Sequence, residues 1–318
     1  MTIQTLDMQQ NASLALDSMP PVWSRVGNTP LVRLQRIAPD LPGTVELHAK
    51  LEWANPGSSV KDRPARAILQ EALARGELSG DRILLDSTSG NMGIAYATLC
   101  TPLSIPVQLV VPANASPERL VILRALGARL TLSDPLEGSE GARELAARMA
   151  EEEPGRYFYA NQYDNPANWQ AHYHSTGPEL FEQTHGRITH LIAGLGTTGT
   201  LTGAGRFLKE TKPELEIVGV QPDGPFHGLE GLKHLPSSHK PGIYDPHLAS
   251  RMEAVSTEDA YAMLHRLARS EGLMVGVSSA AALVAALRVA RTLDDGVLTV
   301  IFPDSAAKYL SQPFWRQA

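Results

Sequence analysis

The stretch THLIAGLGTTGTLTGAGRFLKE, residues 189–210, decides the fold class of this chain. Residues 189–196 form an apolar run of strand length, a turn rich in glycine and threonine follows, and the remainder has a helical pattern. Glycines let backbone N–H groups point toward a ligand, and the start of a helix carries a partial positive charge. We therefore expect a strand, a turn and a helix whose junction binds a phosphate or another anion.

The same alternation of strand and helix recurs through most of the chain. Further apolar runs of strand length lie at 45–52, 82–87, 106–112, 128–133, 216–222 and 297–303. Within 62–76, apolar residues fall at helical spacing: Ala65, Ile68, Leu69, Ala72 and Leu73. Strands linked by helices predict an α/β fold of doubly wound, mostly parallel sheets. Ligands of such sheets bind beyond the carboxyl ends of the strands.

Composition excludes several classes of protein. The chain has 318 residues, 43% hydrophobic and 19% charged, so it can bury a large core and is not a disordered chain. Its net charge of −6 disfavours nucleic acid or a membrane surface as the main partner. Cys100 is the single cysteine, which excludes an internal disulfide and favours a reducing compartment. The first twenty residues have no signal-peptide pattern, so we expect a cytoplasmic protein, and we expect no metal site.

Two more strand-to-helix turns carry polar side chains. The turn DSTSGNMG, residues 86–93, offers hydroxyl, amide and backbone donors to a carboxylate or a ring oxygen. The turn NPGSSVKDR, residues 55–63, places Lys61 at a helix start, where the helix dipole disfavours a cation. A lysine in positive potential has a lowered pKa and can form a Schiff base. Taken alone, the first turn is better explained by an ordinary helix start, and the second by a solvated lysine.

Together, a lysine, an anion-binding turn and a polar turn predict a pyridoxal 5′-phosphate site, because that cofactor has an aldehyde, a phosphate and a ring. Residues 194–199 also match G-x-G-x-x-G, so an NAD-dependent oxidoreductase is an alternative of a different class. That alternative expects an acidic residue about 20 positions further on. The next predicted strand ends in Gln221 and Pro222, with Asp223 beyond it, which weakens the alternative and leaves it open.

Several motifs, in order along the chain, resemble the cysteine synthase family of fold type II pyridoxal-phosphate enzymes, which have a tryptophan synthase β-like fold. They are GNTPLVRL (27–34), NPGSSVKDR (55–63), TSGNMGIA (88–95), GLGTTGTLTG (194–203), GVSS (276–279) and FPDSAAKYLS (302–311). The resemblance covers nearly the whole chain after residue 23. The segments AHYHSTGPEL (171–180) and GRITHLIAGLGTTGTLTG (186–203) are most similar to the cysteine synthase B branch.

The resemblance implies a role for each matching residue. Lys61 would bind the cofactor covalently and later transfer protons. The residues that would hold the cofactor's phosphate are Gly196, Thr197, Thr198, Gly199 and Thr200. Asn91 would bind its phenolic oxygen, and Ser305 would face its ring nitrogen, with Asp304 as the alternative. The residues that would bind the amino acid substrate are Thr88, Ser89, Gly90, Met92 and Gln162; Met92 stands where the family commonly has threonine.

The implied reaction is a β-replacement in which O-acetyl-L-serine loses its leaving group to give an α-aminoacrylate, and sulfide then adds to form L-cysteine. Two alternatives within the fold are an O-phospho-L-serine sulfhydrylase and a cystathionine β-synthase. Lys233 lies in a stretch with several basic residues, 222–246, and would bind the phosphate of O-phospho-L-serine. Whether free sulfide or a sulfur-carrying protein is the donor stays open.

The resemblance also implies two α/β domains and a homodimer. Residues 46–160 would form a smaller, mobile domain that closes the site. Residues 1–45 and 161–318 would form a larger domain that carries the phosphate-binding turn. A polar stretch with proline and glycine at 152–165 independently favours a boundary there.

Overall fold

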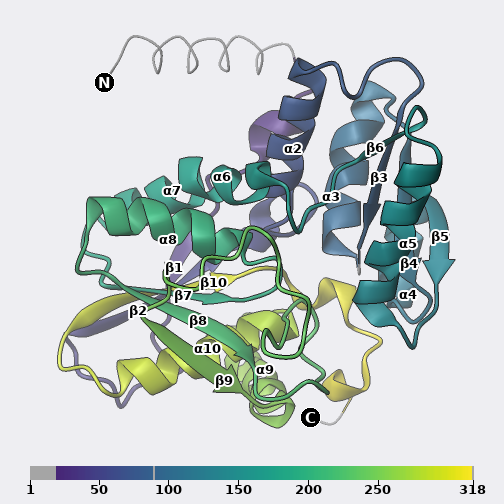
Figure 1. Ribbon diagram of the computed structural model, residues 1–318. Helices are drawn as coiled ribbons and strands as arrows, with labels where there is room; N and C mark the ends of the chain where they lie inside the picture. The colour runs from purple at the N-terminus through teal and green to yellow at the C-terminus, as the bar shows by residue number, and fades with distance from the viewer. Residues whose placement is uncertain (1–18, 89, 317–318) are drawn as a thin grey trace, which may run out of the picture.

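The computed structural model describes residues 19–88 and 90–316, which form two α/β units, each built on its own sheet (Figure 1). The larger sheet has the spatial order β1 (Leu31–Arg33), β2 (Val45–Leu51), β10 (Gly296–Phe302), β7 (His190–Gly194), β8 (Glu216–Pro222) and β9 (Arg251–Val255). Strand β1 is antiparallel to β2, and the other neighbours are parallel.

Helices cover both faces of this six-stranded sheet. On one face, α9 (Thr257–Glu271) and α10 (Val277–Ala290) enclose a core that includes Leu47, Val218 and Leu283. On the other face, α7 (Thr176–Gln183) and α8 (Gly199–Thr211) enclose a core that includes Leu191 and Leu201. Helix α6 (Pro166–His174) packs on α8 and on α2 of the smaller unit.

The smaller sheet is entirely parallel, in the order β5 (Arg129–Ser133), β4 (Val107–Pro112), β3 (Ile83–Ser87) and β6 (Tyr157–Tyr159). Helices α2 (Asp62–Ala74), α3 (Asn91–Cys100) and α4 (Pro117–Ala125) share one core with the sheet. Helix α5 (Gly138–Glu152) covers the other face. Short 3₁₀ helices are η1 (Trp23–Arg25), η2 (Glu52–Ala54), η3 (Thr101–Leu103), η4 (Ala306–Lys308) and η5 (Pro313–Trp315).

The predicted fold class is confirmed, since both sheets are mostly parallel and helices cover both of their faces. Each of the seven predicted strands is present, and the helix predicted within 62–76 is α2. Strands β1, β6 and β9 were not predicted. The interruption at 152–165 contains β6, the strand at one edge of the smaller sheet. Strand β2 belongs to the larger sheet, so the expected start of the smaller domain at residue 46 falls inside a strand of the larger unit.

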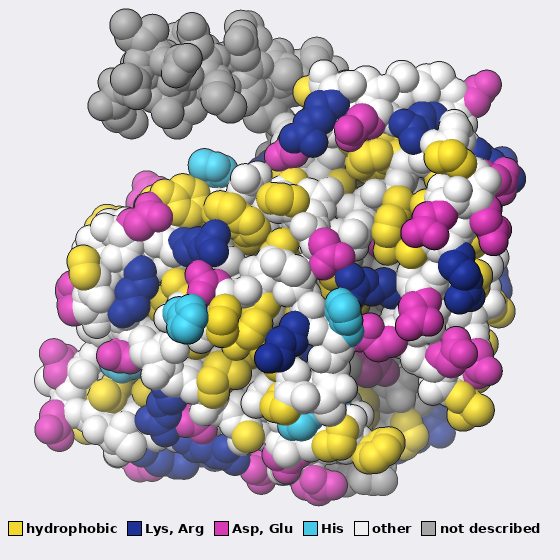
Figure 2. Space-filling model, viewed as in Figure 1, with side chains coloured by type: hydrophobic (Ala, Val, Ile, Leu, Met, Phe, Trp, Pro, Cys, Tyr) yellow, Lys and Arg dark blue, Asp and Glu magenta, His cyan; other side chains and the backbone are white. Residues whose placement is uncertain are grey.

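The surface is mixed in charge where it can be seen. On the face in Figure 2, basic and acidic side chains are interspersed, and neither sign forms a broad patch. Within the described residues, none of the helices combines the length and the apolar character that a membrane span needs.

Candidate active site

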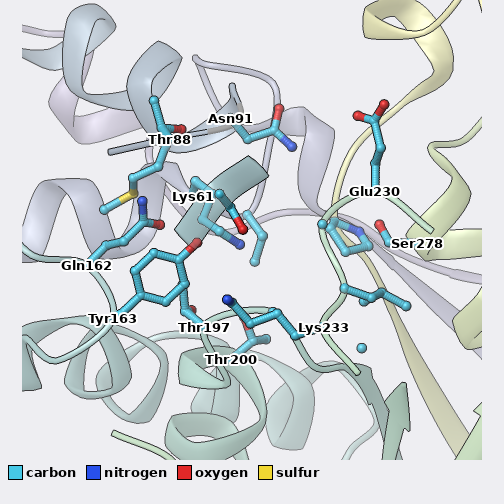
Figure 3. A pocket seen from close by; sticks show the side chains of 18 of the residues that line it. Lys61, Thr88, Asn91, Gln162, Tyr163, Thr197, Thr200, Glu230, Lys233 and Ser278 are labelled. Atoms are coloured by element: carbon cyan, nitrogen blue, oxygen red, sulfur yellow. The ribbon is translucent and has the colours of Figure 1, made fainter. Parts of the chain in front are cut away.

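A cavity of about 310 Å³ lies where strands of both sheets end. Its wall includes Thr88 after β3 and Pro112 at the end of β4, both in the smaller unit. From the larger unit it includes Gly194 at the end of β7 and Pro303 after β10. The strand-to-helix turns therefore meet at one space, and Figure 3 shows side chains from both units around it.

The turn between β7 and α8 forms a cradle on the cavity wall. The residues of this turn that line the cavity are Gly196, Thr197, Thr198 and Thr200. A Cβ on Gly196 would collide with the carbonyl oxygen of Gly231, so only glycine fits there. The Thr198 hydroxyl is buried and has no hydrogen-bond partner among the described residues. An anion at the start of α8 would satisfy this hydroxyl and the first N–H groups of the helix.

His172 supports this cradle from behind. Its Nδ1 atom lies 2.9 Å from the hydroxyl oxygen of Thr176, and its Nε2 atom lies 3.3 Å from that of Thr200. Burial lowers the pKa of His172 well below its usual value, and the charges of Arg63 and Lys61 lower it further. A neutral imidazole therefore contacts Thr200 and restricts where its hydroxyl can point.

Lys61 is the N-cap residue of α2, as predicted, and its side chain lines the cavity. Removal from water lowers the pKa of Lys61, while the charges of Asp304 and Glu52 act in the opposite direction. A lysine in this setting holds more of the neutral, nucleophilic amine at pH 7 than an exposed lysine does. In Figure 3 the Lys61 side chain points toward the central space.

The polar turn before α3 presents Thr88, Asn91 and Met92 to the cavity. The Thr88 hydroxyl accepts hydrogen bonds from the N–H groups of Gly90, at 3.0 Å, and Gly93, at 3.3 Å, which holds the turn in place. Gly90 itself does not line the cavity, and its φ of 150° is one that side chains rarely allow. Ser89 lies outside the described residues.

Gln162 completes the polar side of the cavity. It is 3% exposed, and its amide donates a hydrogen bond of 2.7 Å to the carbonyl oxygen of Ser87, at the end of β3. The segment after β6 is thereby tied to the turn that follows β3. A polar group held in this way presents fixed dipoles to a bound carboxylate or ring oxygen.

Asn91 is held by two charged residues from the C-terminal part of the chain. Its amide donates to Asp304 at 2.8 Å, and its carbonyl oxygen accepts from Lys308 at 2.8 Å. Tyr309 also donates to Asp304, at 2.6 Å. Both sides of the Asn91 amide are thereby fixed in orientation.

Comparisons with known proteins agree with this geometry. Residues 22–304 match the family model described as pyridoxal-phosphate dependent enzyme. A protein of Aquifex aeolicus named cysteine synthase is 50% identical over 291 residues, which cover 90% of this chain and 89% of that protein. A cysteine synthase B of Pseudomonas aeruginosa is 43% identical, covering 92% of this chain and 96% of its own length. A crystal structure of cysteine synthase from Entamoeba histolytica has a TM-score of 0.88 and 32% identity, covering 94% of this chain and 93% of that one.

The chain belongs to the pyridoxal-phosphate dependent enzymes. The glycine-rich turn at 194–199 is thus part of a pyridoxal-phosphate enzyme, not of the alternative NAD-dependent oxidoreductase. The residues present fit the cofactor, since a buried hydroxyl without a partner lies at the start of α8 and a lysine with a lowered pKa lines the same cavity.

In this pyridoxal-phosphate enzyme, two motifs with serines lie near the cavity, and they differ in what they present to it. Ser305 does not line the cavity, because its backbone forms a β-bridge and then enters η4. Its neighbour Asp304 is fully buried and does not line the cavity either. Ser278, in the first turn of α10, is 5% exposed and lines the cavity instead. Ser278 belongs to the motif GVSS at 276–279, which contributes to the family resemblance without indicating a role for its serines.

Arg119, Tyr163 and Glu230 also line the cavity, and no motif in the sequence indicates them. Arg119 comes from α4, and Glu230 from the segment between β8 and β9. Lys233, predicted to bind a substrate phosphate, does line the cavity, but it forms an ion pair with Glu140 of α5. The family motifs gave no signal for these residues, because they lie between the motifs.

Proposed function

We propose that this enzyme is a cysteine synthase that converts O-acetyl-L-serine and sulfide into L-cysteine and acetate. The observation that carries the proposal is that Lys61 and the cradle at the start of α8 line one cavity. The similarity to cysteine synthases over about nine-tenths of the chain supports the same reaction.

We further propose roles for the residues that would hold pyridoxal phosphate. Lys61 would bind it covalently, Asn91 would hydrogen-bond its phenolic oxygen, and Ser278 would replace Ser305 beside its ring nitrogen. The groups that would hold its phosphate are the N–H and hydroxyl groups of Gly196, Thr197, Thr198, Gly199 and Thr200. When bound, the cofactor supplies an aldehyde that condenses with amines and a ring that accepts electrons from the substrate's Cα atom.

The chain's own residues would then direct the β-replacement. The substrate carboxylate would be bound by the side chains of Thr88, Ser89 and Gln162 and by the N–H groups of the 88–92 turn, which include that of Gly90. Met92 would pack against it. Lys61, once free, would remove the proton from Cα, and acetate would leave Cβ with the electron pair of the C–O bond. Sulfide would next form the S–Cβ bond, and Lys61 would return a proton to Cα.

Lys61→Ala is the direct test of this proposal. The purified wild type should carry the yellow colour of a lysine-bound cofactor and form cysteine from O-acetyl-L-serine and sulfide. The variant should lose that colour. Its kcat should fall at least about 10³-fold, because the amine that acts as base is removed. Lys240→Ala, which removes an exposed lysine, is the matched control and should keep both properties. A wild type that prefers homocysteine to sulfide would show a cystathionine β-synthase instead.

We also propose a cytoplasmic homodimer whose smaller unit closes over the site. The free, buried thiol of Cys100 supports a reducing compartment. Exposed apolar side chains such as Val121 and Leu132 offer surface for a partner subunit. The smaller unit would comprise the elements from α2 to β6, since β2 belongs to the larger sheet. Light scattering on the purified protein tests the dimer.

A further inference from the structure

Two cations other than Lys61 line the cavity, Arg119 and Lys233, and each is paired with a glutamate across the two units. Arg119 of α4 lies 2.5 Å from Glu230, in the segment between β8 and β9. Lys233 of that same segment pairs with Glu140 of α5. Both ion pairs thus join the smaller unit to the 222–246 segment of the larger one.

Aromatic rings hold the two cations in place. The Arg119 guanidinium lies 4.6 Å from the centre of the Tyr309 ring, and the Lys233 amine lies 5.0 Å from the centre of the Tyr163 ring. Figure 3 shows Lys233 and Tyr163 meeting at the cavity. Both rings are large and rigid, so neither cation can easily move away from the space where a substrate would sit.

The cations are buried and their partners are not. The side chains of Arg119 and Lys233 are 5% and 10% exposed, whereas those of Glu230 and Glu140 are 41% and 39% exposed. Charges removed from water act over longer distances than exposed ones, so these two cations would attract an anion more strongly without the two glutamates. With a carboxylate on each of these two cations, neither ion pair carries a net charge.

We propose that Glu140 and Glu230 determine which activated serine the enzyme accepts, by excluding a dianionic leaving group. A phosphate ester carries close to two negative charges at pH 7, so it must displace both carboxylates to reach the cations. An acetyl ester is neutral and leaves both ion pairs intact. This inference rests on the proposed function and assigns the choice of leaving group to two residues that would touch neither the cofactor nor the reacting atoms.

Replacement of both glutamates by glutamine tests the inference by binding. In Glu140→Gln/Glu230→Gln, each cation loses its charged partner while the shape of the side chain is kept. Titration of inorganic phosphate into the cofactor-loaded protein, followed by calorimetry, should show binding at least about tenfold tighter than in the wild type. The single variants should fall between these two. Glu144→Gln removes the same charge from an exposed position of α5 and should leave phosphate binding unchanged.

Kinetics on the same proteins provide a second readout. The ratio of kcat/KM for O-phospho-L-serine to that for O-acetyl-L-serine should rise at least about tenfold in the double variant. O-acetyl-L-serine turnover in each preparation shows that the variant is folded. An unchanged ratio with unchanged phosphate affinity would overturn the inference while leaving the cysteine synthase function intact. If the wild type converts no O-acetyl-L-serine, the proposed function fails, and the phosphate titration still decides whether the glutamates exclude anions.

Discussion

Ser278 and Ser305 both lie in motifs near the cavity, but only Ser278 is on its wall. A neutral hydroxyl beside the ring nitrogen would contribute one hydrogen bond of about 0.5–1.5 kcal/mol. We expect Ser278→Ala to lower kcat by about 2- to 10-fold, because that free-energy range corresponds to such a change in rate. Ser305→Ala should leave kcat unchanged. Steady-state kinetics on both variants decides the assignment, and a larger loss in Ser305→Ala would reverse it.

The place of a residue at the cavity was predictable from the sequence where a single local segment determines that place. Lys61 and Thr197 belong to strand-turn-helix units whose spacing shows in the sequence, and both line the cavity. Arg119 and Glu230 are separated by 111 positions and meet only through the packing of the two units. Ser278 and Ser305 both lie in motifs that resemble the family. Ser305 forms a β-bridge and does not line the cavity, and no local sequence pattern predicts this difference.

Helix α2 is the element that positions Lys61, and a buried ionic network holds its first turn against the larger unit. Arg63 pairs with Glu52 at 2.8 Å and with Glu179 of α7 at 2.7 Å. Lys50 of β2 also pairs with Glu179, at 2.7 Å. Arg63 is 1% exposed and Lys50 is fully buried, so the network cannot be loosened without leaving a charge unpaired in the interior.

Glu179 should make stability sensitive to acid. Burial would raise the pKa of Glu179, but hydrogen bonds and charges from Arg63 and Lys50 outweigh it and lower the pKa to about 2. Its folded-state pKa lies below the unfolded value, so its stabilisation is present above about pH 4.5 and is lost as the pH falls toward 2. The two values imply a contribution of about 3 kcal/mol.

We therefore expect Glu179→Gln to destabilise the protein at pH 7 by about 3–5 kcal/mol, because buried Lys50 loses its paired carboxylate and buried Arg63 keeps only Glu52. Its free energy of unfolding should also fall less steeply than that of the wild type between pH 4.5 and 2. Urea unfolding at a series of pH values measures both effects. Glu182→Gln is the control, because Glu182 lies three residues after Glu179 in α7 and is exposed. Parallel pH profiles for wild type and Glu179→Gln would contradict the prediction.

Elements with long apolar runs were predictable, and short or uniformly buried ones were not. Strands β1 and β6 have three residues each, which is too short for an alternating pattern to show. Strand β9, at the edge of the larger sheet, has only two buried residues among its five. Helix α10 is buried on nearly all sides, so its small apolar residues form no stripe.

At the scale of the whole molecule, the cavity lies between two units that have separate cores. The cores around α2 and α5 belong to the smaller sheet, and those around α8 and α10 to the larger one. The ion pairs of Arg119 and Lys233 cross between the units, and their carboxylates reach solvent. Separate cores allow the closure that we propose, and the buried network of Arg63 at the start of α2 would stay in place during it.

Closure can be measured as a distance between spin labels on the two units. Arg148→Cys in α5 and Ala262→Cys in α9 place labels on exposed positions of the smaller and larger units. Cys100 will not compete for the label, because it is fully buried and burial raises its pKa to about 12. Addition of O-acetyl-L-serine to the cofactor-loaded protein should shorten this distance by about 2 Å or more. Labels at Glu182→Cys and Ala262→Cys, both in the larger unit, should show no change. If both pairs respond alike, or neither does, the two units do not close over the site.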